Sequence, residues 1–217
     1  MSNLRVGIIN YGVGNLGSVQ NAFAFIQTHF SDVLPHTLEI KVESHPERLQ
    51  DYDKLLLPGV GAFGNAMTHL KNTHLDEAIR EFVQSGKFLI GICLGMQLLF
   101  EQSEEFGNHK GLGLIEGKVV GFEHIAPLKV PHIGWNSCNF TPEGKHSKLF
   151  RGIADGSFFY FVHSFHIQTQ PQFILAQCTY SYPFGAIVHK DNLFAIQAHP
   201  EKSHNVGLRL LANFLTL

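Results

Sequence analysis

The feature that most constrains this chain is the segment LIGICLGMQLLF at residues 89–100, where an apolar run enters a G-x-C-x-G pattern. The apolar run predicts a buried β-strand over residues 88–93, and the stretch that follows, which has no breaker after Gly95, predicts a helix over residues 94–102. Gly91 and Gly95 remove Cβ atoms where the backbone must turn sharply. The pattern is the cysteine counterpart of the G-x-S-x-G elbow, which presents a nucleophile at the end of a strand.

Cys93 lies at this sharp turn, and two physical consequences are expected there. The partial positive charge of a helix N-terminus favours the thiolate form of the side chain. The backbone amide of the next residue, Leu94, is placed to donate to an oxyanion. The alternative is a buried structural cysteine, which the pattern alone leaves open because buried free cysteines are common. A nucleophile also needs a base from elsewhere in the chain.

The candidate base is in the segment FAIQAHPEKS at residues 194–203. An apolar strand ends there at His199, Pro200 and Glu201, and the proline breaks the strand so that both neighbouring side chains can project from its end. An imidazole can take a thiol proton, and a carboxylate can orient and stabilise the imidazolium. The alternative is a polar surface histidine, since the chain has 14 histidines. His199 differs from the others because an acid follows two residues later, directly after a buried strand.

Two glycine-rich turns are candidate functional loops. The segment PGVGAF at residues 58–63 follows a buried strand at 54–57, and it is either a loop that needs positive φ or a source of a second oxyanion donor. The sequence does not choose between these. The segment GVGNLG at residues 12–17 resembles a dinucleotide-binding fingerprint, but no acid near residue 30 ends a second strand to bind a ribose. We therefore set the dinucleotide hypothesis aside.

The remaining periodicity predicts one α/β domain over residues 1–217 with a β-rich second half. A first strand at 4–10 precedes a helix at 21–30, and residues 65–83 predict a helix or a pair of short helices closed by Gly86. The second half predicts strands at 118–122, 129–140, 157–166, 173–180, 184–189 and 193–198, several of them antiparallel, before a final amphipathic helix at 205–215.

Composition excludes several classes of function. The formal net charge is −2 with no basic stripe, which argues against binding nucleic acid or an anionic membrane surface. No apolar run approaches the ~20 residues that cross a bilayer, and the N-terminus does not look like a signal peptide. Cys93, Cys138 and Cys178 cannot all pair within the chain and are far apart in the sequence, so we expect a reduced, cytoplasmic protein. The histidines show no zinc spacing, so neither a metal nor another cofactor is expected.

Taken together, six segments resemble the triad-type (class I) glutamine amidotransferases: NYGVGNLGSV, LLLPGVGAF, GICLGMQLLFE, PHIGWN, YFVHSF and HPEKS. Their order and spacing are most similar to the members that supply ammonia to imidazole glycerol phosphate synthase in histidine biosynthesis. The resemblance runs from about residue 5 to the C-terminus. It implies a flavodoxin-like three-layer sandwich with a mostly parallel central sheet, which agrees with the pattern of strands and helices.

The resemblance also implies a role for each matching residue. Cys93 corresponds to the nucleophile that forms a γ-glutamyl thioester, His199 to the base and then acid, and Glu201 to the residue that orients His199. The oxyanion hole corresponds to the amides of Leu94 and of Val60 or Gly61. Binding of L-glutamine is implied for four further residues, Gln97, Glu105, Ser164 and Phe165.

Two residues depart from the family pattern. Phe165 stands where a tyrosine is frequent, so a hydroxyl that could bind substrate is absent. Ala198 replaces an aromatic residue before the catalytic histidine, which removes packing but no reacting group.

A partner is implied as well: a synthase (cyclase) subunit that forms a heterodimer with the glutaminase and receives ammonia through a passage between the sites. Asn15, Trp135, Asn136, Tyr160 and Lys202 match positions at or near that interface. Trp135 favours the interface interpretation because tryptophan is enriched in protein contacts; the alternatives are a core tryptophan and a solvated Lys202.

Three other functions remained open on sequence. One is a paralogous glutaminase that serves a sugar-modifying enzyme of surface-polysaccharide synthesis. Another is a stand-alone cysteine hydrolase, against which the PHIGWN and HPEKS segments argue. The last is a scaffold with a decayed site, which the intact Cys93, His199 and Glu201 disfavour.

Overall fold

The computed structural model describes residues 3–30, 34, 37–122 and 129–217. The strands among these residues join in one sheet, and their bounds are β1 (Asn3–Ile9), β2 (Thr37–Glu43), β3 (Lys54–Leu57), β4 (Phe88–Ile92), β5 (Phe100–Ser103), β6 (His109–Lys110), β7 (Ile115–Gly121), β8 (His132–Phe140), β9 (Ser157–His163), β10 (Phe165–Gln168), β11 (Ile174–Tyr180), β12 (Tyr182–Lys190) and β13 (Leu193–Ile196). The α-helices are α1 (Leu16–His29), α2 (Phe63–Asn72), α3 (Leu75–Gln84), α4 (Leu94–Leu98), α5 (Pro142–Lys145) and α6 (His204–Leu215).

The centre of the sheet is parallel, in the order β2-β1-β3-β4-β13. This is the flavodoxin-type order, in which the crevice outside the carboxyl ends of the strands is the usual ligand site. Beyond β13 the sheet becomes largely antiparallel through β12, β10 and β7, and β11, β8 and β9 branch from β12. The predicted fold class, a mostly parallel α/β sheet with a β-rich second half, is confirmed.

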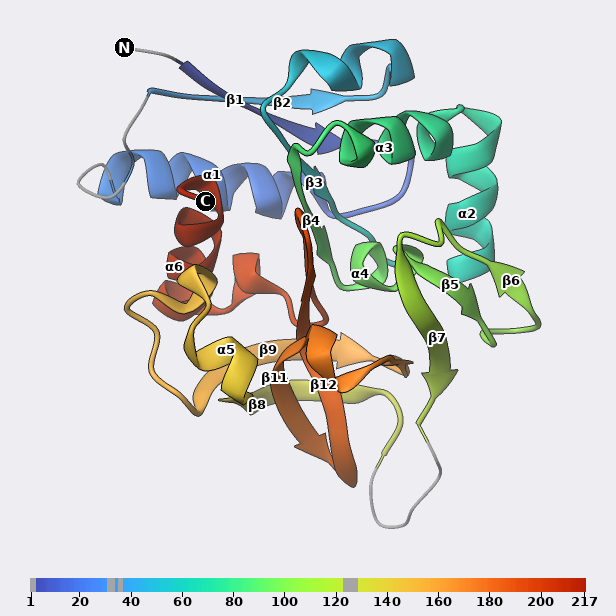
Figure 1. The fold of residues 1–217 in the computed structure, drawn as a ribbon, viewed down its shortest axis with the longest axis vertical. Coiled ribbons are helices and arrows are strands. Elements are labelled where there is room, and N and C mark those ends of the chain that lie inside the picture. The colour runs from blue at the N-terminus through green and yellow to red at the C-terminus, as the bar shows by residue number, and fades with distance from the viewer. Residues whose placement is uncertain (1–2, 31–33, 35–36, 123–128) are drawn as a thin grey trace.

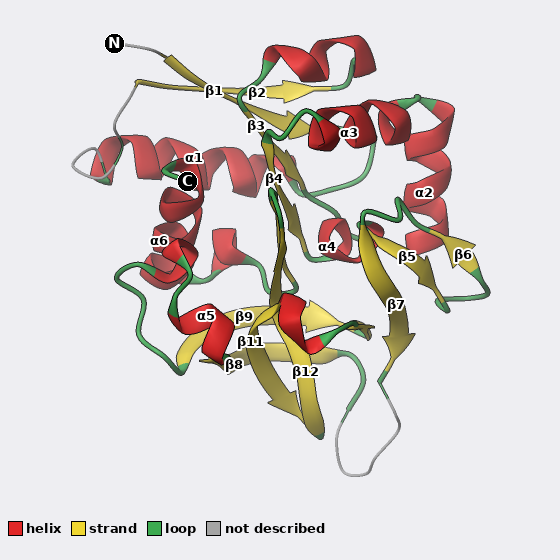
Figure 2. Cartoon of the chain, in the orientation of Figure 1, coloured by secondary structure: helices red, strands yellow, loops and turns green. Residues whose placement is uncertain are grey.

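Strand alternation distributes the core over both faces of the parallel sheet. Ile8, Leu56 and Ile90 face one apolar cluster together with residues of α1 and α6, whereas their neighbours Ile9, Leu57 and Leu89 face a second cluster with residues of α2 and α3. Figure 1 shows α1 and α6 on one side of the strands and α2 and α3 on the other. Figure 2 shows the same three layers, with the β-rich second half extending from one end of them.

The predicted helix over residues 94–102 is wrong beyond Leu98. Helix α4 ends at Leu98, and Phe100–Ser103 forms strand β5, which pairs in parallel with β7 and antiparallel with β6. The backbone of residues 111–115 approaches so closely that Leu112 N–H donates to Leu98 O and Ile115 N–H donates to Leu99 O. These long-range partners take the carbonyls that a continuing helix would have used, so tertiary pairing overrides local preference.

The helical pattern over residues 65–83 forms the pair of short helices that the sequence allowed, α2 and α3, because His74 adopts a left-handed conformation (φ 56°) between them. Two other differences are smaller. The predicted strand over 157–166 divides into β9 and β10 at Ser164. Strand β2, which the sequence did not reveal, pairs in parallel with β1 at one edge of the sheet.

No helix within the described ranges is both long enough and apolar enough to cross a bilayer.

Candidate active site

The turn at Cys93 explains both glycines of the G-x-C-x-G pattern. Cys93 has φ 54° and ψ −112°, a rare conformation for a residue with a side chain. A Cβ atom on Gly91 would lie 2.7 Å from the carbonyl oxygen of Gly95, and one on Gly95 would collide with the carbonyl oxygen of Leu57. Only glycine allows this close approach of β3, β4 and α4. The turn therefore fixes Cys93 just beyond the carboxyl end of β4.

Pairing between β4 and β13 brings the second reactive segment beside the first. The register pairs Ile92 with Ile196, and the amide of Cys93 donates to the carbonyl of Ile196 at 2.8 Å. His199 follows three residues after β13 ends, and its amide donates to the carbonyl of Tyr160 at 2.8 Å. The parallel pairing of two strands far apart in the sequence thus places Cys93 and His199 together beyond the carboxyl ends of β4 and β13.

His199 and Glu201 form a buried pair. Nδ1 of His199 lies 2.8 Å from Oε1 of Glu201, and the two side chains are 4% and 2% exposed. Burial alone lowers the pKa of His199, but the neighbouring Cys93 sulfur and the Glu201 carboxylate outweigh it and raise that pKa to about 10. Nε2 of His199 and Oε2 of Glu201 are buried without a hydrogen-bond partner among the described residues. The imidazole therefore has one nitrogen held by a carboxylate and one still available.

A cavity of about 370 Å³ adjoins these residues. Every residue predicted for the site except Glu201, which lies behind His199, lines it: Val60, Gly61, Cys93, Leu94, Gln97, Glu105, Ser164, Phe165 and His199. Pro131, Val162 and His163 also line it and were not foreseen. The structure thus brings together residues from six separate segments of the chain.

The PGVG loop forms the wall beside the nucleophile. Leu57 pairs with Gly91, so the loop after β3 runs next to the turn after β4. Gly61 has φ +93°, so this loop does contain the positive φ that its glycines predicted. Val60 and Gly61 also line the cavity. The amide of Leu94 begins a helix and has no intrahelical acceptor. Amide donors from two loops can therefore converge near the sulfur.

The lining of the cavity also includes the polar side chains of Glu105 and Gln97. Oε2 of Glu105 accepts from the amide of Phe63 at 2.6 Å, and burial raises the pKa of this carboxyl. Gln97 donates from Nε2 to the carbonyl of Phe165 at 3.0 Å. Phe165 thus contributes its backbone to this network, so the family tyrosine hydroxyl that it lacks is not part of the contact.

Two buried residues that support the site were missed. Ser203 donates to the carbonyl of His199 at 2.6 Å and accepts from the amide of Tyr160 at 3.0 Å, which fixes the turn after His199. Gln197 is fully buried and donates from Nε2 to the sulfur of Cys93 at 3.8 Å. The available signal for Gln197 was a single polar residue inside the otherwise apolar run FAIQA.

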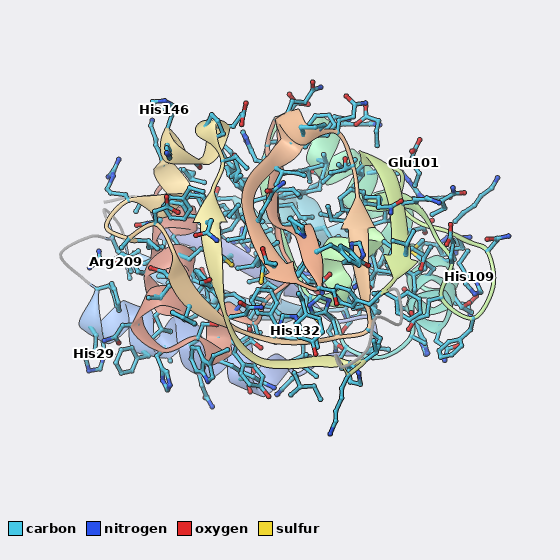
Figure 3. The ribbon with its side chains drawn as sticks, turned by 90° about the horizontal axis from the view of Figure 1, so that it is seen from below. His29, Glu101, His109, His132, His146 and Arg209 are labelled. Atoms are coloured by element: carbon cyan, nitrogen blue, oxygen red, sulfur yellow. The ribbon has the colours of Figure 1, made fainter. Side chains whose placement is uncertain are left out.

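No group of three or more metal-ligating side chains occurs among the residues that the structure describes. His29, His109 and His146, labelled in Figure 3, lie at separate edges of the molecule.

A buried cysteine at a strand–helix turn, a histidine–carboxylate pair and a flavodoxin-type sheet define the class I glutamine amidotransferases, and the family model "Glutamine amidotransferase class-I" matches residues 8–217. The chain belongs to this family. Solved structures agree on the fold: "Crystal structure of glutamine amidotransferase" aligns at TM-score 0.71 with 17% identity over 97% of both chains. "Structure of PurLQS from Thermotoga maritima" aligns at TM-score 0.73 with 16% identity over 99% of both.

Sequence relatives define the branch within the family. "Imidazole glycerol phosphate synthase subunit HisH" of Helicobacter hepaticus is 99% identical over the full length of both chains. The protein of the same name from Methanocaldococcus jannaschii is 42% identical over 98% of this chain and 99% of its own. Within the class I glutamine amidotransferases, the chain therefore belongs to the HisH subunits of imidazole glycerol phosphate synthase.

Proposed function

We propose that this chain is the glutaminase subunit of imidazole glycerol phosphate synthase and hydrolyses L-glutamine to L-glutamate and ammonia. The observation that carries the chemistry is that Cys93 and His199 line one cavity while Glu201, buried behind it, holds His199. The biosynthetic role rests on relatives that bear this name, one of them 99% identical. A cytoplasmic site for histidine biosynthesis follows from the same assignment.

The first half of the reaction forms the thioester. His199, whose pKa is raised to about 10, takes the proton of the Cys93 thiol, and the sulfur becomes the nucleophile. The sulfur attacks the side-chain amide carbon of glutamine, and the resulting oxyanion accepts hydrogen bonds from the amides of Leu94 and of Val60 or Gly61. The C–N bond then breaks while His199 gives its proton to the departing nitrogen, which leaves as ammonia.

The second half restores the enzyme. His199, now neutral, takes a proton from water as the water oxygen attacks the thioester carbon. The C–S bond breaks, glutamate leaves, and the thiolate–imidazolium pair forms again. His199 therefore acts as base toward the thiol, then as acid toward the departing nitrogen, and again as base toward the attacking water, while Glu201 orients the imidazolium in both halves. Gln97, Glu105, Ser164 and the backbone of Phe165 hold the amino-acid end of the substrate.

We further propose a heterodimer with a synthase subunit that receives the ammonia. Much free ammonia is protonated near neutral pH and is not nucleophilic, so a protected passage has a chemical purpose. Strands β8 and β9 expose apolar side chains on one face: Ile133 is 60% exposed, Trp135 45% and Phe158 58%. Exposed large apolar groups that share a face are typical of protein contacts.

The reaction is tested by cysteine substitution. We expect Cys93→Ala and Cys93→Ser to abolish glutamine hydrolysis, and Cys138→Ala and Cys178→Ala to retain it. The last two cysteines are register partners in β8 and β11, and burial raises the pKa of Cys138 well above its ordinary value and that of Cys178 to about 12, so neither thiol is reactive. A fully active Cys93→Ala protein would exclude the mechanism.

The partner is tested by reconstitution. Adding the synthase subunit and its acceptor ligand should raise glutaminase turnover at least tenfold, or about 1.4 kcal/mol of barrier. A chain that hydrolyses glutamine at full rate alone and is unaffected by the synthase would be a stand-alone hydrolase. Activation only by a sugar-modifying synthase would instead identify the paralogous function.

A further inference from the structure

Gln197 occupies an unusual position for an uncharged polar side chain. It directly follows β13, two residues before His199, and is fully buried. Its Nε2 donates to Cys93 Sγ at 3.8 Å, and its Oε1 accepts from Nε2 of Gln97 at 3.0 Å. Burying an amide is costly unless its polar atoms are paired, so an apolar residue would serve better if the position only filled space.

The orientation of this amide is determined by its neighbours. A carbonyl oxygen can only accept, so the Gln97 atom that lies 3.0 Å from the carbonyl of Phe165 must be its NH₂ group. The same NH₂ group contacts Gln197, which must therefore present its oxygen to Gln97. The NH₂ group of Gln197 is left facing the sulfur. A reversed amide would place two NH₂ groups against each other.

The carbonyl of Phe165 also contacts buried His163, which is in turn held by buried His132. Nδ1 of His163 lies 2.8 Å from the carbonyl of Phe165 and must donate to it, so Nε2 of the neutral ring accepts from Nδ1 of His132 at 3.0 Å. Nε2 of His132 (Figure 3) in turn accepts from Asn136 at 3.3 Å. Burial lowers the pKa of His163 to about 3 and of His132 to about 4, so both rings stay neutral and their donor directions stay fixed.

We propose that Gln197 is a further catalytic residue of this site, an oriented hydrogen-bond donor that stabilises the thiolate of Cys93. The proposal rests on the assignment of Cys93 as nucleophile. The hydrogen bond from Gln197 to the sulfur is strongest whenever the sulfur is a thiolate, before it attacks the substrate and as it leaves the thioester, because the sulfur then carries negative charge. It weakens while the sulfur is acylated, since the charge is then gone. Gln97 is the residue that positions the Gln197 amide.

Two substitutions separate a donor from a merely structural residue. Gln197→Met has a similar shape but neither polar atom. Gln197→Glu keeps an oxygen for Gln97 but places a second acceptor against the sulfur. A donor role predicts that both variants lose kcat, Glu at least as severely as Met, with KM little changed. A structural role predicts the opposite order, with Gln197→Glu close to wild type because the bond to Gln97 is kept.

The direct readout is the amount of thiolate. The absorbance near 240 nm that is lost when Cys93 is alkylated at pH 7 reports the thiolate, and the buried thiols of Cys138 and Cys178 do not contribute. We expect the ratio of thiolate to thiol, and kcat of the full chain with its synthase, to fall about tenfold in Gln197→Met, as for loss of one hydrogen bond to a charged group.

Asn213→Leu is the matched control. Asn213 is also a buried amide; it lies on α6, does not line the cavity, and donates to the carbonyls of Leu149 and Arg151. It should lower thermal stability without changing the thiolate signal. If Gln197→Met does not fold, Gln197→Glu carries the test. Wild-type kcat and thiolate signal in a folded Gln197 variant would overturn the inference, while an inactive Cys93→Ala would still support the proposed function.

Discussion

Removing the charge of Glu201 is the sharpest test of how the histidine is tuned. Glu201→Gln keeps the shape of the side chain and an oxygen that can accept from His199 Nδ1. It removes the carboxylate that faces the imidazole at 2.8 Å in a site where both side chains are nearly inaccessible to water. The expected effect is therefore electrostatic, with little change in packing.

The magnitude follows from the pKa of His199. Its rise from an ordinary 6.5 to about 10 corresponds to roughly 5 kcal/mol in favour of the imidazolium. Cys93 and Glu201 share this stabilisation and also offset the cost of burial. An even division assigns about 2.5 kcal/mol to Glu201, so we expect kcat/KM to fall between about tenfold and a hundredfold. His199→Ala, which removes the proton donor itself, should be close to inactive.

Two measurements check this reasoning. Steady-state glutaminase kinetics with the synthase bound give kcat/KM for both variants. Nitrogen NMR of labelled histidine follows the titration of His199: wild type should stay protonated from pH 6.5 until the pH approaches about 10, and both Glu201→Gln and Cys93→Ala should lose the proton at lower pH. Near-normal rates in both His199→Ala and Glu201→Gln would show that the base lies elsewhere. An unshifted titration would refute the electrostatic argument.

The other predictions concern the elbow and the partner surface. Gly95→Ala should cost about 3 kcal/mol or more of unfolding free energy, measured by urea denaturation, because its Cβ meets the carbonyl of Leu57. Gly17→Ala on helix α1, where the new methyl meets nothing within 4 Å, should not destabilise the protein; equal stability of the two variants would contradict the collision. The half-exposed ring of Trp135 stacks on His204, with ring centroids 4.9 Å apart, so it is held in place for contact with a partner. Trp135→Ala should weaken the synthase complex about tenfold or more in calorimetry. It should leave Cys93 labelling by a glutamine analogue intact. Phe25→Ala, an exposed aromatic on α1, is its control, and unchanged affinity in Trp135→Ala would remove β8 from the interface.

The sequence by itself determined the local features of this protein. The turn at Cys93 was predictable because the glycines that permit it lie within two residues of the cysteine. The buried strands and the break after His199 were predictable for the same reason: apolar runs and a proline act on their own segment of backbone. The order of six such segments was enough to indicate the family.

Only the tertiary structure decided which distant groups meet. The end of α4 at Leu98 depends on carbonyls taken by residues 111–115, and local helix preference carries no information about them. His163 and Ser203 lie in recognised segments and Gln197 lies just before one, but no local pattern gives their partners. Their roles arise from the register of β4 with β13 and of β8 with β9, which sets buried donors opposite buried acceptors. Register depends on two segments that are far apart in the chain. The local sequence therefore determines which chemical group a residue carries, and the pairing of the strands determines which groups it contacts.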